Sequence, residues 1–439
     1  MDDLNNLKGL LFGVKKKSIL VLLFNAISTL LILFLHIAMA RILGHENYSD
    51  YSYVITILTV LALINTLGFE TSAQRFLPVF YAKSNWSLLK GFIVQSFKVV
   101  ILLSIFLGIF SSLLLLSIKD MIRPELLKIF WIGILALPPT SLILLSTGIL
   151  KGLKNPIFST LPKLIIRPLL ILLIVLTAAY YKFEVNGFHA MTIDVIISTF
   201  ALICGIILIN QSFSKKIKNV NSQSLLKEWI SISVGILAIS LMQLLIRSND
   251  VIILGVFSGT EVSGPYSVAS RIALLAGFGL IAINTVIPAI ISKYFAEKNL
   301  NAIQIIATMS ARLNFIFSII VAIVIIFMNE YILNFFGSEF IQASSALTIL
   351  CSAQIVNSLT GSVGFILIMT GHQKELSKIL LKTFFIHIIL CFLLIPALGI
   401  DGAAIATALT IIISNLLLAI RCYNKAKIDP SIFGFQKVS

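Results

Sequence analysis

Charged residues are scarce in this chain. Of its 439 residues only 12% are Asp, Glu, Lys or Arg, whereas 58% are hydrophobic and the mean hydropathy is +1.04. Soluble proteins carry about a quarter of their residues as charged ones, so the composition excludes that class. The apolar residues form runs long enough to cross a bilayer as helix, which takes about 20 residues. They lack the alternation of a membrane β-barrel, so we predict an all-α integral membrane protein.

Cysteines and enzymatic signatures are also sparse. The four cysteines, Cys204, Cys351, Cys391 and Cys422, have neither paired nor metal-ligand spacing, so we expect neither a disulfide nor a metal site. The chain has no GxxxxGK[ST] phosphate loop, no HExxH motif and no nucleophile elbow. Its loops are short and poor in acidic residues and histidine. We therefore expect a protein that is not an enzyme and that needs no cofactor.

The apolar windows predict twelve transmembrane helices. They cover residues 18–42, 52–74, 92–117, 127–150, 160–180, 191–210, 230–256, 265–290, 305–328, 342–369, 377–397 and 401–421. When the lysines and arginines at the window ends are counted with the adjoining loops, Arg167 among them, 24 lie on the side of the N-terminus and five on the other side. Cytoplasmic loops carry such an excess, so we expect both termini in the cytoplasm. Topology thereby explains the net charge of +15, and we expect no nucleic-acid partner.

Short stretches of the first half recur in the second half. "GHENYSDYS" (44–52) aligns with "GTEVSGPYS" (259–267), and "NGFHA" (186–190) aligns with "DGAAI" (401–405), both at a separation of 215 residues. An even number of helices per half makes this a parallel repeat, which packs as two six-helix lobes with a site between them. The predicted parts are an N-terminal lobe (1–210), a basic cytoplasmic linker (211–229), a C-terminal lobe (230–421) and a cytoplasmic tail (422–439).

Six basic residues lie in or beside the predicted helices, staggered from one membrane face to the other. They are Arg41, Arg75, Lys98, Arg247, Arg271 and Arg312. A charge at this depth costs a few kcal/mol and marks a candidate functional residue. We interpret the set as the lining of a wet passage that binds an anionic group, because guanidinium stays charged and grips phosphate oxygens in pairs. For Arg41, Arg75 and Lys98, an equal alternative is that the side chain reaches to the membrane surface.

Two acidic residues share these helices. Asp250 lies three residues after Arg247, on nearly the same helical face, and Glu70 lies near the end of the second predicted helix. Both carboxylates are candidates for binding a coupling cation. For Arg247 and Asp250, a structural ion pair is the competing interpretation.

Three groups of motifs resemble those of a known family. The first group consists of A-R-I-L-G (40–44), a tyrosine-rich stretch and R-F-L-P (75–78). The second consists of D-V-I-I-L-G (250–255) followed by G-P-Y-S-V-A-S-R (264–271). The third is G-I-D-G-A-A-I-A-T (399–407). Together they are similar to the signatures of polysaccharide flippases, the branch of the multidrug/oligosaccharidyl-lipid/polysaccharide exporter superfamily that includes Wzx-type O-antigen flippases. The resemblance covers nearly the whole chain. Gly264-Pro265 replaces the valine-glycine that usually precedes the tyrosine.

The resemblance implies a flippase of the bacterial cytoplasmic membrane. It would move an undecaprenyl-pyrophosphate-linked oligosaccharide, the repeat unit of O-antigen, capsule or exopolysaccharide, from the inner to the outer leaflet by alternating access. Besides this substrate and membrane lipids, polysaccharide polymerase and chain-length proteins are candidate partners. The family's cationic cavity holds pyrophosphate and sugar, and Arg41, Arg247 and Arg271 occupy the matching motifs, whereas Arg312 matches none.

Three alternatives stay open. A cation-coupled drug or metabolite antiporter of the same superfamily would share the fold, but its site should favour acidic residues. A lipid II flippase shares the chemistry but carries about two further helices, for which the chain has no apolar windows. A membrane scaffold would leave the buried arginines without a purpose.

Overall fold

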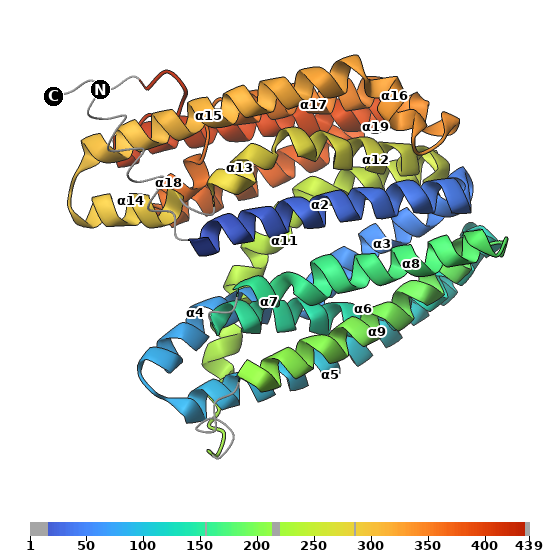
Figure 1. Ribbon diagram of the computed structural model, residues 1–439, viewed down its shortest axis with the longest axis horizontal. Coiled ribbons are helices and arrows are strands. Elements are labelled where there is room, and N and C mark those ends of the chain that lie inside the picture. The colour runs from blue at the N-terminus through green and yellow to red at the C-terminus, as the bar shows by residue number, and fades with distance from the viewer. Residues whose placement is uncertain (1–15, 154–155, 213–219, 285–286, 435–439) are drawn as a thin grey trace. The chain divides into compact units, whose positions relative to one another are not determined.

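The computed structural model describes residues 16–153, 156–212, 220–284 and 287–434, and every regular element in this part is a helix (Figure 1). Nine described helices are long and apolar enough to cross a membrane, or ten when one bent pair counts as a span. The prediction of an all-α, multi-pass membrane protein is therefore confirmed. The count of twelve helices stays a prediction.

The observed helices differ from the predicted windows in two ways: some windows are broken into shorter helices, and the last two windows form one helix. The window 52–74 corresponds to α3 (His45–Asn65) and α4 (Phe69–Ala82), which are bent by 41°. The last two windows form one element, α19 (Gln373–Arg421), with a non-helical residue at Gly399 (φ 55°, ψ −125°). Hydropathy reports that a segment suits the bilayer, but it does not report where its backbone bends.

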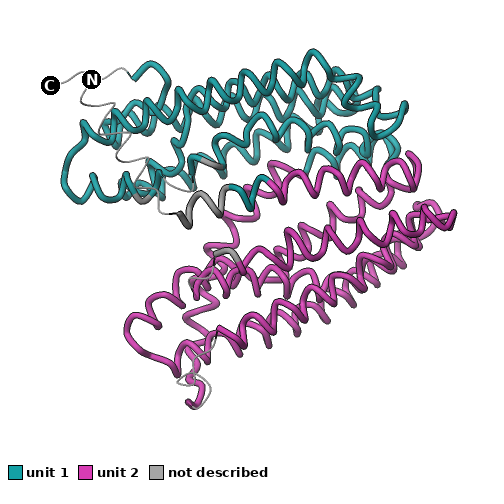
Figure 2. Tube along the Cα trace, in the orientation of Figure 1, with its two compact units in different colours: residues 1–26, 249–439 teal, residues 27–248 magenta. Residues whose placement is uncertain are grey.

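The chain folds into two compact units (Figure 2). Unit 2 is residues 27–248, and unit 1 is residues 1–26 together with 249–439. The division falls inside α11 (Leu226–Ser258). The start of this helix belongs to unit 2 because the Trp229 ring is buried there, with its centroid 5.3 Å from that of Phe92.

In unit 2, α6 (Pro124–Gly152) lies at the centre and packs against α3, α4, α5 and α9. Two glycines of α6 permit the contact with α4. A β-carbon at Gly148 would collide with the backbone of Glu70, and one at Gly152 with the backbone of Ala73. The other elements of this unit are most of α2 (Lys16–Leu43), α5 (Trp86–Ile118), η1 (Lys119–Met121), α7 (Pro156–Leu161), η2 (Pro162–Ile166), α8 (Arg167–Tyr180) and α9 (Gly187–Ser212).

In unit 1, α17 (Ser344–Ser358) takes the central place and packs against α12, α15 and α19 (Figure 1). A break at residues 359–362 separates it from α18 (Val363–Met369). The other elements are α12 (Thr260–Ala276), α13 (Phe278–Ile283), α14 (Ile287–Ala296), α15 (Leu300–Phe327), α16 (Asn329–Asn334), η3 (Ser338–Ala343) and η4 (Cys422–Ala426).

Two local conformations recur at matching positions of the two halves. Gly44 before α3 has φ 76° and ψ 169°, and Gly259 before α12 has φ 86° and ψ 163°. Asn85 caps α5 by accepting a hydrogen bond from the Leu88 amide, and Asn299 caps α15 in the same way. The two glycines are 215 residues apart, the separation at which the sequence stretches align, and the two asparagines are 214 residues apart. Similar residues at these positions therefore adopt similar backbone conformations.

Many hydroxyl groups inside the helices donate to a backbone carbonyl oxygen of their own helix. Thr56, Thr147 and Thr410 each donate to the carbonyl oxygen four residues earlier, at 2.7 to 2.9 Å. This local bond removes the cost of a polar group in a membrane helix. The carboxylates and guanidiniums have no such local solution, so their partners identify the candidate site.

Candidate functional site

Arg271 is the predicted site residue whose surroundings call for a ligand. It lies near the end of α12, and Gly264 and Pro265 lie within this helix without interrupting it. The side chain is half-buried, and its Nε atom is buried with no hydrogen-bond partner in the described part of the chain. A buried donor without an acceptor costs about 1–3 kcal/mol, and more when it is charged. The site can therefore bind an anionic oxygen.

Asp250 anchors a buried polar cluster in unit 1. Its side chain accepts hydrogen bonds from the Tyr266 hydroxyl at 2.5 Å, the Thr407 hydroxyl at 2.8 Å and the Val251 amide at 2.8 Å. The residue is 1% exposed. All three donors are neutral, and no cation among the described residues is hydrogen-bonded to this carboxylate. Such a carboxylate can take up a proton or a small cation.

His387 of α19 extends this cluster. It is fully buried, and the imidazole lies close enough to Asp250 for their charges to interact. Its Nδ1 atom lies 3.1 Å from the Thr410 hydroxyl, and its Nε2 atom lies 3.6 Å from the Cys391 sulfur. The cluster therefore joins a buried carboxylate to a buried imidazole, two groups that can hold a proton.

The ion pair considered for Arg247 and Asp250 does not form among the described residues. The Asp250 carboxylate meets hydroxyl donors from α12 and α19, whereas the Arg247 side chain is exposed. A separation of three residues brings two side chains to nearby positions on a helix but does not make them pair. Here the tertiary contacts of Asp250 determine its partners.

The remaining predicted residues occupy varied positions. Arg41, Arg75 and Lys98 are exposed on α2, α4 and α5. Glu70 is half-buried in the first turn of α4, close enough to Lys163 for their charges to interact. The exposed Arg312 donates from Nε to the carbonyl oxygen of Ile432 at 2.8 Å. Substrate contacts of these residues and of Arg247 stay predictions.

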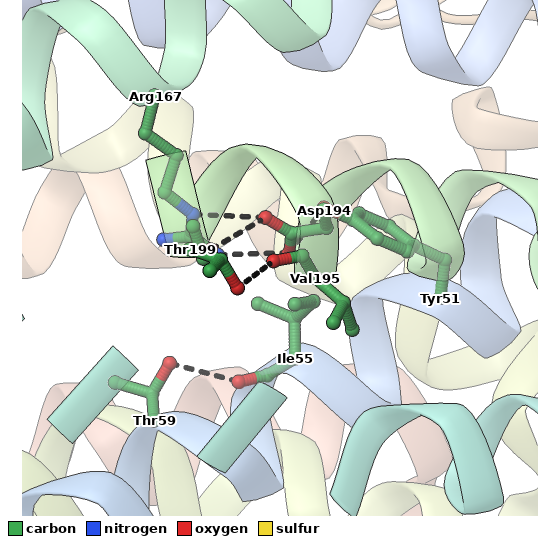
Figure 3. A network of polar contacts seen from close by, with 8 residues as sticks. Tyr51, Ile55, Thr59, Arg167, Asp194, Val195 and Thr199 are labelled. Atoms are coloured by element: carbon green, nitrogen blue, oxygen red, sulfur yellow. Dashed lines mark hydrogen bonds and ion pairs between the residues drawn. The ribbon is translucent and has the colours of Figure 1, made fainter. Parts of the chain in front are cut away.

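A buried ion pair in unit 2 was missing from the sequence-based predictions. Arg167 donates to both carboxylate oxygens of Asp194, at 2.9 and 2.8 Å, and the Tyr51 hydroxyl donates to the same carboxylate at 3.2 Å. Figure 3 shows Arg167 and Tyr51 on either side of Asp194. The lysine and arginine count placed Arg167 with a loop, whereas the residue lies within the candidate span Phe158–Tyr180. The sequence feature that indicates such a pair is Asp194, an acidic residue inside the predicted helix 191–210.

No described group of three or more His, Cys, Asp or Glu side chains is arranged to hold a metal ion. The four cysteines are free thiols in the structure.

Two family models match overlapping parts of the chain. Residues 14–295 match the family described as "Polysaccharide biosynthesis protein", and residues 235–393 match the family described as "MatE". A curated protein of Haloferax volcanii, the probable low-salt glycan biosynthesis flippase Agl15, is 28% identical over 194 residues. The match covers 43% of this chain and 41% of that protein, so it spans about two fifths of the relative.

Solved structures share the fold over most of their length. An inward-facing multidrug resistance MATE family transporter gives a TM-score of 0.71 at 14% identity, covering 91% of this chain and 96% of its own. The lipid II flippase MurJ in an inward closed conformation gives 0.71 at 18% identity, covering 92% and 87%. A MOP superfamily transporter from Pyrococcus furiosus gives 0.65 at 14% identity, covering 93% and 94%. At these identities the likeness establishes the fold alone.

Proposed function

Because the chain belongs to the polysaccharide biosynthesis protein family, as its motifs predicted, we propose that it is a flippase for a lipid-linked oligosaccharide. The proposed substrate is an undecaprenyl-pyrophosphate-linked repeat unit of O-antigen, capsule or exopolysaccharide. It moves from the inner to the outer leaflet of the cytoplasmic membrane by alternating access. The flippase description of the Haloferax relative and the fold shared with MurJ support this proposal.

The buried Nε–H of Arg271, which has no partner among the described residues, is the observation that carries the proposal. Its buried Nε–H needs an acceptor, and a pyrophosphate oxygen supplies one with the charge that a guanidinium favours. A sugar headgroup cannot cross hydrocarbon bare, because each unpaired hydroxyl costs several kcal/mol. A polar groove open to the lipid lets the headgroup cross while the prenyl tail stays in the bilayer.

The proposed architecture is twelve helices in two six-helix lobes, residues 1–210 and 230–421, with both termini in the cytoplasm. The twelve apolar windows and the lysine and arginine asymmetry support it. The matched conformations of Gly44 and Gly259 support the repeat. Residues 211–229 would join the lobes, and residues 422–439 would form the tail. Polysaccharide polymerase and chain-length proteins are the proposed protein partners.

Coupling to an ion or proton is assigned to Asp250 in this proposal, with Glu70 as the second candidate. Asp250 is supported by its neutral bonding partners and by the nearby imidazole of His387. A carboxylate in this setting changes its bonding when it gains a proton or a cation, which gives a transport cycle a point of control.

The experiment that tests the flippase uses cells from which the gene is deleted. They are complemented with wild type, Arg271→Ala, Arg271→Lys or the control Arg421→Ala, whose side chain is exposed at the end of α19. We expect Arg271→Ala to lose surface glycan and to accumulate precursor on the cytoplasmic leaflet. Arg271→Lys should restore part of the glycan, and Arg421→Ala nearly all of it. Normal glycan and precursor in the deletion strain itself would refute the proposal.

A cation-coupled drug or metabolite antiporter is the second candidate. The MatE match over residues 235–393 favours it, because this stretch contains Asp250 and His387. The same strains, together with one that carries Asp250→Asn, separate the two functions. An antiporter predicts drug sensitivity in the deletion strain with normal surface glycan, and a dependence on Asp250 rather than on Arg271.

A further inference from the structure

Residues 427–434, which we term the C-terminal strap, fold back onto unit 1 after the last helix. Lys427 adopts a left-handed conformation (φ 59°) that reverses the chain at the end of η4. Ile428 is then fully buried in an apolar cluster formed by α14, α15, α18 and α19. The strap is therefore anchored in the packed core of unit 1.

The strap runs beside α15 and is held there by two polar side chains of that helix. The Gln304 amide donates to the Asp429 carbonyl oxygen and accepts from the Asp429 amide, both at 2.8 Å. Two helical turns further, about 12 Å along α15, Arg312 donates to the Ile432 carbonyl oxygen at 2.8 Å. Each contact uses the strap's backbone.

The same strap residue that contacts Arg312 also contacts a helix break. The Ile432 amide donates to the carbonyl oxygen of Leu359 at 3.0 Å, and Leu359 begins the break between α17 and α18. Helix breaks at membrane depth expose backbone groups that need partners. The strap supplies one of these partners, so Ile432 contacts both Arg312 and this helix break.

We propose that the C-terminal strap is an autoinhibitory latch, in which the Ile432 carbonyl oxygen occupies the Nε–H of Arg312 until an anionic lipid headgroup, binding the Nε and Nη donors together, displaces it. The proposal rests on the flippase function proposed above. A phosphate oxygen forms a stronger, charge-assisted bond to guanidinium than a neutral carbonyl oxygen does, so the headgroup outcompetes the strap. Displacement of Ile432 also removes its bond to Leu359, which frees the α17–α18 break to move.

A reversible crosslink between the strap and α15 tests this latch. A β-carbon built on Gly434 lies 3.2 Å from that of Thr308, which a small shift brings into the disulfide range of about 3.5–4.5 Å. The full-length Thr308→Cys/Gly434→Cys variant is reconstituted in liposomes with a fluorescent undecaprenyl-pyrophosphate disaccharide as the probe. Flipping is measured after oxidation and again after reduction. Wild type and the two single variants receive the same treatment, and peptide mapping verifies the disulfide.

We expect the oxidised double variant to flip the probe at least tenfold more slowly than the reduced one. The single variants should respond to the oxidant no more than wild type does. Equal flipping by the oxidised and reduced double variant would overturn the latch while leaving the flippase intact. Failure of wild type to flip the probe would instead contradict the proposed function, on which the latch rests.

Amide hydrogen exchange on the wild-type protein provides a measurement without substitutions. Undecaprenyl pyrophosphate should accelerate exchange of the Ile432 amide at least tenfold, whereas undecaprenol, which lacks the anionic group, should leave it unchanged. Unchanged exchange at saturating undecaprenyl pyrophosphate would overturn the latch even if the cysteine variant did not fold.

Discussion

At the scale of single residues, the pair of Arg167 and Asp194 places two charges inside unit 2. The Asp194 side chain is 0% exposed, so removal of Arg167 leaves a buried, uncompensated carboxylate. Breaking such a pair costs about 3–5 kcal/mol, whereas replacing both partners by apolar residues is nearly neutral. We therefore expect Arg167→Met to lower the free energy of unfolding by about 3 kcal/mol and Arg167→Met/Asp194→Leu to recover most of the loss. Denaturant titration in detergent measures both, and equal stability of wild type and Arg167→Met would contradict the assignment.

Asp250 carries a second residue-scale prediction, which concerns energy coupling. Asp250→Asn keeps the size of the side chain but removes its negative charge. We expect it to reduce the dependence of flipping on a proton or sodium gradient at least tenfold in proteoliposomes, because the amide cannot gain a proton or hold a cation. Asp401→Asn is the matched control, since Asp401 in the same unit also accepts from a hydroxyl, that of Ser345. Full gradient dependence in Asp250→Asn would assign coupling to another group.

The candidate site could be predicted in part from the sequence. Arg271 and Asp250 were identified because a charge in an apolar helix is unusual, and that argument needs no tertiary structure. The sequence could not reveal that Asp250 bonds Tyr266 and Thr407, because these residues meet it only through packing. Arg167 was assigned to a loop because hydropathy cannot show that a distant acid will pair with it.

At the scale of elements, the two glycines that precede α3 and α12 determine the backbone conformation at the start of each helix. Gly44 and Gly259 combine positive φ with extended ψ, a region that is essentially restricted to glycine, and no atom lies within 4 Å of a β-carbon built on either. Alanine at either position should therefore destabilise the protein by backbone strain alone, by about 1–3 kcal/mol. Gly235 of α11 has the same free space without a positive φ, so Gly235→Ala should stabilise by about 0.5–1 kcal/mol. Thermal unfolding in detergent compares the three variants, and a loss in Gly235→Ala equal to that in Gly44→Ala would rule out strain as the cause.

The elements were predictable to the extent that apolar length determines them. Long windows such as 92–117 and 305–328 became the continuous helices α5 and α15. The break between α3 and α4 was not predicted. The residues at the break, Thr66 to Gly68, leave the segment apolar enough that hydropathy predicts a single span. Leu67 and Gly68 both have positive φ there, a local backbone choice that hydropathy does not contain.

At the scale of the whole molecule, the two aligned halves make a prediction about membrane orientation. Ser84 and Lys298 occupy matching turns: both are exposed, both have positive φ (53° and 56°), and each precedes a capping asparagine. In a parallel repeat each half crosses the membrane an even number of times, so both turns lie on the cytoplasmic side. Glu184, in the turn before α9, should lie on the outer side.

Single cysteines at these three positions, in a variant without the four natural ones, measure this orientation. A membrane-impermeant maleimide should label Glu184→Cys in intact spheroplasts, but Ser84→Cys and Lys298→Cys only after permeabilisation. Labelling of Ser84→Cys and Lys298→Cys from opposite sides would mean that each half has an odd number of spans and that the repeat is inverted. Two parallel six-helix lobes would then be impossible. Labelling from one side would support two parallel lobes, with Arg271 and the Asp250 cluster on the second of them.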